Sequence, residues 1–357
     1  MTIDREDVKH ALSAIRIPDG RDLIGADMVR ALVIDGGDVR FVIEAPSVEI
    51  ARVMEPMRAA AEAAVAALPG VARVQAVLTA EQAPPALKIG GHPKPQAGPT
   101  AVPGVRRVLA IASGKGGVGK STVSSNLAVA LARQGRRVGL LDADIHGPSQ
   151  PRMMGLSKRP ASPDGKTIHP LQAHGVTVMS IGLMLAEDKA VIWRGPMLMG
   201  ALQQMLGQVV WTHHTGGQDL DVLIVDLPPG TGDVQLTLCS KTHVDGAIVV
   251  STPQDVALLD ARKALDMFTT LKTPVLGLIE NMSTFHCPNC GFEAHIFGHG
   301  GVRAEAGKLG LPFLGALPID LDTRLGGDAG TPVAAGEGRM ADAYARIARD
   351  LVAAGRA

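Results

Sequence analysis

The sequence contains few aromatic residues, few cysteines and no excess of charge of either sign. Aromatic residues make up 3% of the 357 positions, so the cores should be aliphatic, and surfaces that stack on nucleic-acid bases are disfavoured. The 35 basic and 35 acidic residues cancel to a formal net charge of zero, which argues against bulk DNA as a partner. Three cysteines do not make a disulfide framework. We therefore expect neither a nucleic-acid partner nor a fold that depends on disulfides.

The sequence also lacks a long apolar segment. No run of about 18 apolar residues is free of glycine, proline and charge, and the first residues, MTIDREDVKHAL, are too polar for a signal peptide. We therefore expect a cytoplasmic protein that does not bind a membrane. The length of 357 residues exceeds the usual size of a single core, and it favours one large domain with a small one.

Three regions of different composition divide the chain. Residues 1–81 are expected to form a small α+β domain. Its elements are expected in the order helix, strand, strand, helix and strand, at about residues 4–15, 28–35, 38–45, 47–68 and 72–80. Residues 82–104 hold six prolines and no periodic pattern, which is typical of a linker. Residues 105–357 make up the larger domain.

Short apolar runs alternate with amphipathic helices throughout residues 105–357. The expected strands lie near residues 106–113, 136–144, 176–182, 220–230, 245–253, 274–282 and 312–320. Continuous apolar runs are typical of strands that are buried on both faces of a parallel sheet. The alternation predicts an α/β fold with a doubly wound, mostly parallel sheet, and a ligand at the carboxyl ends of its strands.

A glycine-rich loop, SGKGGVGKST at residues 113–122, follows the first of these strands and precedes a helix. It matches the P-loop pattern, in which backbone N–H groups and the positive end of the helix surround phosphates. The loop consists of Gly114, Lys115, Gly116, Gly117, Val118, Gly119, Lys120, Ser121 and Thr122. Lys120 is expected to reach the β- and γ-phosphates of ATP, and the Ser121 hydroxyl to bind Mg²⁺.

Three carboxylates come at the ends of two apolar strands. Asp226 ends the run VLIVD, where an acid would hold Mg²⁺ through water. Asp142 and Asp144 lie two residues apart at the end of another strand, so both can project toward the same cleft. One of them near the metal and one orienting the attacking water would suit phosphoryl transfer to water. The alternative is that these residues only cap turns after strands.

The loop sequence resembles the deviant Walker A motif of the SIMIBI class, which includes MinD- and ParA-type ATPases and the nitrogenase iron protein. The resemblance implies a homodimer in which Lys115 reaches the nucleotide of the partner subunit. It also implies that Asp144 occupies the position of the aspartate that activates water, with Asp142 beside it. Lys115, Lys120 and Asp144 are therefore the expected catalytic residues. Without a partner, Lys115 would be an ordinary solvated lysine of a loop.

The cysteine pair Cys287-Pro-Asn-Cys290 has the spacing of two ligands for one metal or cluster. Four ligands are needed, and two completions are open. His295 and His299 could complete a zinc site in one chain, with His286 nearby, or a second chain could supply two more cysteines around a [4Fe–4S] cluster on a two-fold axis. A redox-active thiol pair is a third possibility. Cys239 is expected to be a small buried residue.

The motifs DADIHGPS, WRGP at 193–196, LIVDLPPGTGD and FHCPNCG follow the glycine loop in this order. Together they resemble the Mrp/ApbC family of iron–sulfur cluster carrier ATPases over about residues 105–350. The resemblance implies a labile [4Fe–4S] cluster bridging two subunits, delivered to apo iron–sulfur proteins in contact with assembly scaffolds. It also implies that Asn281 reads the adenine and that Pro318 and Asp320 line the base. Asn126 is a further candidate contact, or only a polar residue of the helix.

The first 80 residues resemble the small domain linked to iron–sulfur assembly that often precedes this ATPase. The resemblance rests on the order of elements and on LPGVARVQAVL at residues 68–78. The cysteine found in some such domains is absent, because residues 45–49 read APSVE. An alternative for the whole chain is a zinc-stabilised positioning or scaffold ATPase like MinD or ParA. The end of the chain, ADAYARIARDLVAAGRA, has few large apolar residues for a membrane anchor.

Overall fold

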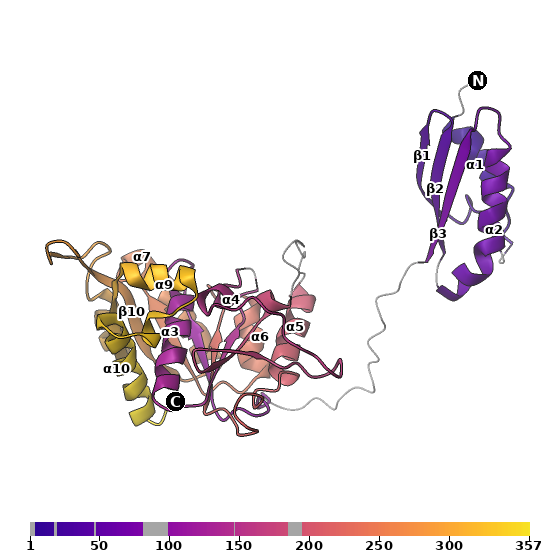
Figure 1. Cartoon of the computed structure of the whole chain (residues 1–357). Coiled ribbons are helices and arrows are strands. Elements are labelled where there is room, and N and C mark those ends of the chain that lie inside the picture. Colours follow the sequence, from indigo (N-terminus) through magenta and orange to yellow (C-terminus); the bar gives the residue numbers. More distant parts are fainter. Residues whose placement is uncertain (1–3, 18–19, 46–47, 81–98, 146, 185–194) are drawn as a thin grey trace. The chain divides into compact units, whose positions relative to one another are not determined.

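The structure is a computed structural model that describes residues 4–17, 20–45, 48–80, 99–145, 147–184 and 195–357. The chain divides into two compact units, Met1–Pro95 and Gln96–Ala357 (Figure 1). Most of the expected linker, and Trp193 and Arg194 of the WRGP motif, lie outside the described residues. No helix among the described residues is both long and apolar enough to cross a bilayer.

The N-terminal unit is a three-stranded sheet with two helices. Its elements are α1 (Arg5–Ser13), β1 (Val29–Asp35), β2 (Asp38–Ala45), α2 (Val48–Ala66) and β3 (Arg73–Ala80). The strand order is β1-β2-β3, with β1 antiparallel and β3 parallel to β2. Along β2, Val39, Phe41 and Ile43 are buried in alternation with more exposed residues, because successive side chains of a strand point to opposite faces. The order of elements is the one expected.

The C-terminal unit is built around a nine-stranded sheet. Its strands are β4 (Val108–Ala112), β5 (Val138–Asp142), β6 (Leu171–Ala173), β7 (Val176–Ser180), β8 (Val222–Asp226), β9 (Gly246–Ser251), β10 (Val275–His286), β11 (Glu293–Ala294) and β12 (Phe313–Ile319). The order is β11-β10-β9-β4-β8-β5-β7-β6, and β12 also pairs with β10. All pairs are parallel except β6 with β7 and β11 with β10.

Helices cover both faces of this sheet (Figure 1). They are α3 (Lys120–Arg133), α4 (Gln150–Met153), α5 (Gly195–Gly207), α6 (Asp233–Lys241), α7 (Asp255–Thr270), α8 (Gly301–Leu309), α9 (Leu321–Ala329) and α10 (Arg339–Ala353), with 3₁₀ turns at Ile181–Leu183 and Val333–Ala335. Along β4, Val108 and Ala110 pack in one core with α5 to α8, whereas Leu109 and Ile111 pack in the other with α3 and α10. The doubly wound, mostly parallel α/β fold expected from the sequence is therefore confirmed.

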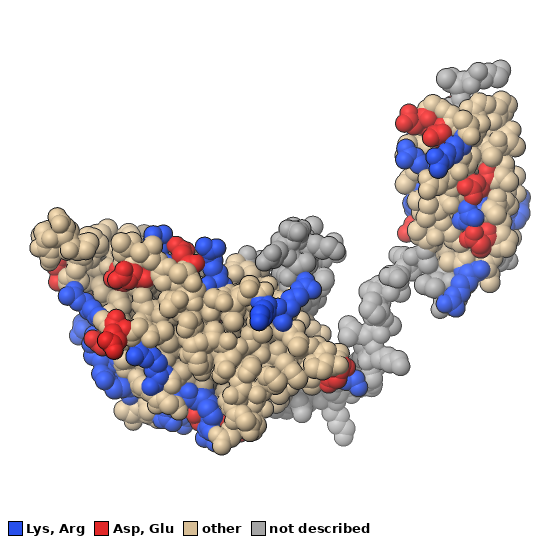
Figure 2. All heavy atoms as spheres, viewed as in Figure 1, with Lys and Arg blue, Asp and Glu red and all other residues tan. Residues whose placement is uncertain are grey.

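The last helix uses its apolar face inside the molecule. In α10, Met340, Tyr344, Ile347 and Leu351 are all buried, and the helix packs on α3. Basic side chains collect on the outer side of this region, with acidic ones among them (Figure 2). Because its apolar face is already covered, α10 does not present that face to a membrane.

Candidate functional site

The glycine loop connects β4 to α3 in the middle of the sheet, and two of its glycines are required by close contacts. At Gly114, a Cβ atom would lie 2.0 Å from the carbonyl carbon of Asp260 in α7. At Gly119, which has a left-handed backbone with φ of 82°, a Cβ atom would lie 2.2 Å from the side-chain nitrogen of Asn281. A side chain at Gly114 would overlap with the main chain of α7, whereas a side chain at Gly119 would strain the left-handed backbone and displace the amide of Asn281.

Lys120 is buried among the carboxylates predicted from the sequence. Its ammonium Nζ donates to Asp226 Oδ1 at 2.7 Å and lies 3.8 Å from Asp144 Oδ2. It also donates to the Ser121 hydroxyl at 3.2 Å. The structure therefore brings Lys120, Ser121, Asp144 and Asp226 together in one place, and only 6% of the Lys120 side chain is exposed.

Asp142 and Asp226 face each other across the paired strands β5 and β8, and both are fully buried. Asp142 accepts hydrogen bonds from the Ser180 hydroxyl at 3.0 Å and from the backbone N–H of Gln150 and Asp144, both at 3.1 Å. Burial, and after it the negative charge of Asp226, raise the pKa of Asp142 to about 7. A cation between the two carboxylates would relieve this repulsion.

The donor set at this point fits Mg²⁺, which prefers oxygen ligands and retains several waters. The hydroxyl of Ser121 and the carboxylates of Asp142 and Asp226 are the oxygen donors. The buried Gln150 side chain lies beside them: its Nε2 donates to Asp226 Oδ2 at 2.8 Å and to Ser121 O at 3.0 Å. Its Oε1 has no hydrogen-bond partner among the described residues, so it can accept a bond from water.

Lys115 differs from Lys120 in its surroundings. Its side chain is half-buried at the front of the loop, and its ammonium makes no hydrogen bond or ion pair with a described residue. The backbone carbonyl of Lys115 accepts from the Ser113 hydroxyl at 3.0 Å, which fixes the start of the loop. The side chain therefore remains available to a ligand or a partner.

The three residues expected at the base occupy two places. Asn281, at the end of the regular part of β10, donates through Nδ2 to the carbonyl of Val118 in the loop at 2.8 Å. Pro318 lies near the end of β12, two residues before Asp320. The Asp320 carboxylate caps α9 by accepting from the backbone N–H and the hydroxyl of Thr323, both at 2.8 Å. Only Asn281 therefore touches the phosphate loop directly.

Asn126 has a structural role in α3. Its Nδ2 donates to Thr122 O at 2.8 Å, and its Oδ1 accepts from the N–H of Ala334 at 2.9 Å. With both ends of its amide bonded inside the protein and 3% exposure, Asn126 joins α3 to the Val333–Ala335 turn.

The cysteine pair lies in a tight turn after β10, and β11 returns antiparallel to the end of that strand. The N–H of Cys287 donates to Phe292 O, and the N–H of Gly291 donates to Cys287 O, both at 2.9 Å. Backbone N–H groups of Cys290 and then Asn289 point at the Cys287 sulfur and lower its pKa. Cys287 is half-buried and Cys290 is exposed, so the turn presents two thiols to the outside.

The histidines after the turn do not complete a metal site. The rings of His295 and His299 are in contact, tilted by 30° with centroids 4.5 Å apart, and His286 and His295 each lie 3.7 Å from the carboxylate of Glu293. No three His, Cys, Asp or Glu side chains among the described residues are arranged to hold a metal. The structure thus brings together the two cysteines, but not the one-chain set of Cys287, Cys290, His295 and His299.

Comparison with known proteins identifies the family. Residues 104–352 match the family described as NUBPL iron-transfer P-loop NTPase, and residues 5–76 match the family described as iron-sulfur cluster assembly protein. The chain is a NUBPL-type iron-transfer P-loop NTPase. The resemblance to an iron–sulfur carrier ATPase, preceded by an assembly-linked domain, is therefore confirmed.

Named relatives of this NTPase cover most of its length. It is 40% identical over 364 residues to the iron-sulfur cluster carrier protein of Helicobacter pylori, which covers 98% of this chain and 93% of that one. It is 50% identical over 254 residues to the protein of the same name from Haemophilus influenzae, covering 70% and 67%. A solved nucleotide-binding protein from Archaeoglobus fulgidus in complex with ADP has a TM-score of 0.55 and 41% identity, covering 64% and 87%. MinD of Pyrococcus furiosus, with a TM-score of 0.52 and 21% identity, shares the fold.

Several polar residues that organise the NTPase site were not identified from the sequence. Ser124 donates to Asp226 Oδ1 at 2.9 Å, and Ser180 and Gln150 bond Asp142. The buried Gln235 donates through Nε2 to Pro228 O at 2.8 Å and to Gly230 O at 3.1 Å, which holds the loop after β8. Of these residues, only Ser124 could have been found from the sequence, because it lies one helical turn after Lys120 and therefore on the same face of α3.

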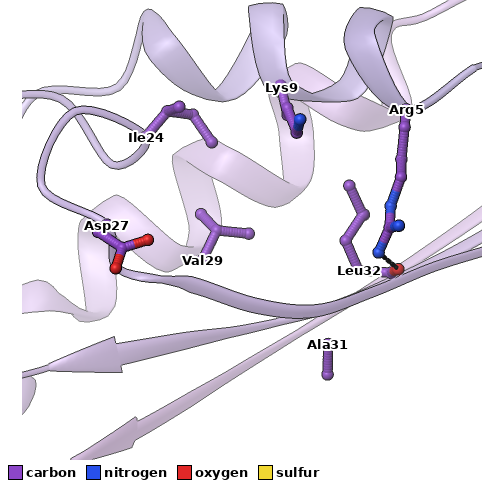
Figure 3. Close-up of a pocket in the computed structure, with 7 residues that line it drawn as sticks. All are labelled: Arg5, Lys9, Ile24, Asp27, Val29, Ala31 and Leu32. Carbon is purple, nitrogen blue, oxygen red and sulfur yellow. Dashed lines mark hydrogen bonds between the residues drawn. The ribbon is translucent and has the colours of Figure 1, made fainter.

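The N-terminal unit of the NTPase contains a separate hollow of about 220 Å³ between α1 and β1 (Figure 3). Arg5 and Lys9 of α1 and Asp27 are its charged residues, and Arg5 donates to Leu32 O at 2.8 Å. Neither a thiol nor an imidazole lines it, and the sequence of this unit contains no cysteine. Thiolate ligands for a cluster can therefore come only from the C-terminal unit.

Proposed function

We propose that this chain is an ATP-hydrolysing carrier that binds iron–sulfur clusters and delivers them to apo iron–sulfur proteins. One observation carries the proposal: a single folded unit contains both a buried lysine–carboxylate site behind a phosphate loop and an exposed turn with two thiols. Similar proteins named as cluster carriers support the same activity. We further propose a cytoplasmic homodimer, with domains at residues 1–81 and 105–357 joined by a linker at 82–104.

The phosphate loop is proposed to bind ATP with Mg²⁺. Backbone N–H groups of residues 114–122 would surround the phosphates, and Ser121, Asp142 and Asp226 would hold the ion directly or through water. The ion, when bound, neutralises charge on the phosphates. Lys120 would exchange its bond with Asp226 for the β- and γ-phosphate oxygens. Asp144, beside that site, would orient the attacking water and take its proton.

The base is proposed to lie near Asn281, whose side-chain amide offers both a donor and an acceptor. Pro318 and Asp320 would line the other side. Both residues also border a cavity of about 300 Å³ that reaches Cys287. Pro318 and Asp320 would thus border both the base and the cavity beside the Cys287 thiol.

Two half-complete sites support a symmetric dimer. Lys115 has no partner among the described residues of its own subunit, and Cys287 and Cys290 supply two of the four ligands that a [4Fe–4S] cluster needs. In an isologous dimer each half would be completed by the same residues of a second copy. The cluster is the cargo, held between two turns, and a slow ATPase would accompany its loading or release.

The N-terminal unit is proposed to dock assembly scaffolds or receiving proteins. Its family match supports a link with iron–sulfur assembly, and it offers no thiol of its own. A docking surface attached through a linker would raise the local concentration of a partner near the cysteine turn.

The proposal is tested by anaerobic reconstitution of the full chain with iron and sulfide, followed by metal analysis and sizing. We expect a brown protein with about four irons for every two chains, in a dimer. Cys287→Ala and Cys290→Ala should abolish the colour, whereas Cys239→Ala, which removes a buried thiol elsewhere, should retain it. Bound zinc without iron would contradict the carrier function, and a brown protein in the Cys287→Ala variant would overturn the assignment of the cluster to the cysteine turn.

A further inference from the structure

One strand, β10, contacts the phosphate loop and holds the segment that contains the two cysteines. Asn281 and Glu280 are adjacent in this strand and both are buried. Because successive side chains of a strand point to opposite faces, they reach different layers of the molecule. Cys287 follows the last residue of the same strand. A short piece of backbone therefore joins the two proposed sites.

Glu280 fixes the far end of the cysteine segment. Its Oε1 accepts from the N–H of Gly300 at 3.0 Å, and its Oε2 accepts from the N–H of Val302 at 2.9 Å. These N–H groups belong to the start of α8, where Gly300 has no capping side chain of its own. A carboxylate at a helix N-terminus is favourable. Residues 287–300 are thus held by β10 at both ends: by continuity at Cys287 and by Glu280 at Gly300.

Asn281 fixes the phosphate loop to the same strand. Its Nδ2 donates to Val118 O at 2.8 Å, and Gly119 leaves room for it because a Cβ atom there would be 2.2 Å away. The contact is buried, so a change in the backbone of the loop at Val118 changes the position of the Asn281 side chain or breaks the bond.

The strand is irregular between these contacts and the cysteines. Met282 has a left-handed backbone with φ of 57°, which is unusual for a residue with a side chain. The register with β12 shifts between Asn281, opposite Leu317, and Phe285, opposite Ile319. The Ser283 hydroxyl donates to Leu317 O at 3.1 Å across this irregularity. Strained segments of this kind are found at sites that adopt more than one arrangement.

We propose that residues Glu280–Ser283 couple nucleotide binding at the phosphate loop to the setting of Cys287 and Cys290. A movement of the phosphate loop shifts Asn281 through its hydrogen bond, and the irregular backbone at Met282 changes conformation with it. Glu280 is a positioning residue, because it holds the end of the cysteine segment at Gly300. The inference rests on the proposed function and deepens it by naming the connection between its two sites. By linkage, a cluster on the cysteines changes nucleotide affinity by the same factor that nucleotide changes cluster affinity.

The first experiment needs no cluster. In the full, cluster-free chain, the rate of maleimide labelling at Cys287 and Cys290 is measured with and without Mg-ADP. We expect ADP to change this rate about five-fold or more in the wild type. In Glu280→Gln, one N–H of α8 would face an amide NH₂ instead of an oxygen, and the effect of ADP should disappear while the ADP Kd stays the same.

Two further variants protect the test from a simple loss of folding. Glu305→Gln is the matched control, because Glu305 is also buried on α8 but its carboxylate accepts hydrogen bonds from Arg262 and from none of residues 287–300. It should retain the effect of ADP. Met282→Gly removes the backbone strain without removing a hydrogen bond, and it should reduce the effect.

The outcomes separate this inference from the proposed function. An unchanged labelling rate on ADP binding in the wild type, or a full effect in both Glu280→Gln and Met282→Gly, would overturn the coupling even if the protein carries a cluster. Conversely, coupling in a protein that takes up no iron would reject the carrier function and retain the connection between the sites. With cluster-loaded protein, a matching change in ADP Kd confirms reciprocity.

Discussion

The phosphate loop and the cysteine turn are built in opposite ways. Lys120 and Asp226 are buried and bonded to each other, and the side chains that bond them come from β8, α3 and α4 of the same subunit. Cys287 and Cys290 lie on a projecting turn with exposed neighbours, such as Phe292 at 68% exposure. One site is organised before any ligand arrives. The other presents two thiols, and in the proposed carrier the remaining ligands of the cluster would come from a second subunit.

The largest effect is expected when the buried ammonium of Lys120 is removed from the phosphate site. In Lys120→Ala the paired carboxylates lose their positive partner and the phosphates lose a charged donor, so ATP hydrolysis should fall about 1000-fold. Steady-state phosphate release measures this loss. Lys308→Ala, on the last turn of α8, should hydrolyse ATP at the wild-type rate; equal rates in both variants would show that the buried lysine is not catalytic.

A smaller effect is expected at the lysine that has no partner in its own subunit. Lys115→Ala should leave the ADP Kd of the chain unchanged and lower hydrolysis about 10- to 100-fold, because a charged hydrogen bond would be lost only when two subunits close. Turnover per subunit, measured against protein concentration, checks this. If the variant loses ADP affinity instead, Lys115 contacts the nucleotide of its own subunit, as Lys120 is expected to do.

The smallest effect concerns the pH dependence of the thiols in the cluster-free protein. The pKa of Cys287 is lowered by the N–H groups of Cys290 and Asn289, so its reactive thiolate should appear at a lower pH than in an ordinary cysteine. Burial raises the pKa of Cys239 to about 11, so that thiol should stay protonated and unlabelled near neutral pH.

Alkylation followed by mass spectrometry, from pH 6 to 9, measures both thiols in one sample (about the range over which free thiols ionise). Labelling at Cys287 should rise first as pH increases, with Cys239 at least about 10-fold slower throughout. Urea-unfolded protein is the control, in which the difference should vanish. Equal rates in the folded chain would contradict the assigned surroundings of both thiols.

The sequence indicated the fold well because its signals were local. The buried strands are continuous apolar runs, such as VLIVD before Asp226, and the loop at 113–122 has a pattern tied to a strand and a helix. These features depend on neighbours along the chain. The positions of Lys120, Asp144 and Asp226 around one point follow from the parallel sheet, which brings its carboxyl ends together.

Other features required contacts between distant residues. The spacing of Cys287, Cys290, His295 and His299 suited zinc, and only the folded chain shows that the two histidine rings lie against each other. Strand β10 continues to His286, four residues beyond the expected end, because β11 pairs with its extension. Gln150 gave no signal, since a lone glutamine after PS becomes informative only when Asp226 and Ser121 lie beside it.

Gly114 has a consequence for the spacing of the layers. The backbone of α7 at Asp260 lies against this glycine so closely that even the methyl group of alanine would overlap with main-chain atoms, which cannot rotate away. Position 114 therefore sets the distance between the sheet and a whole helix, independently of any phosphate chemistry. A larger residue there would first push α7 away from β4. The first glycine of the loop therefore sets how closely a helix packs on the sheet, in addition to any role at the phosphates.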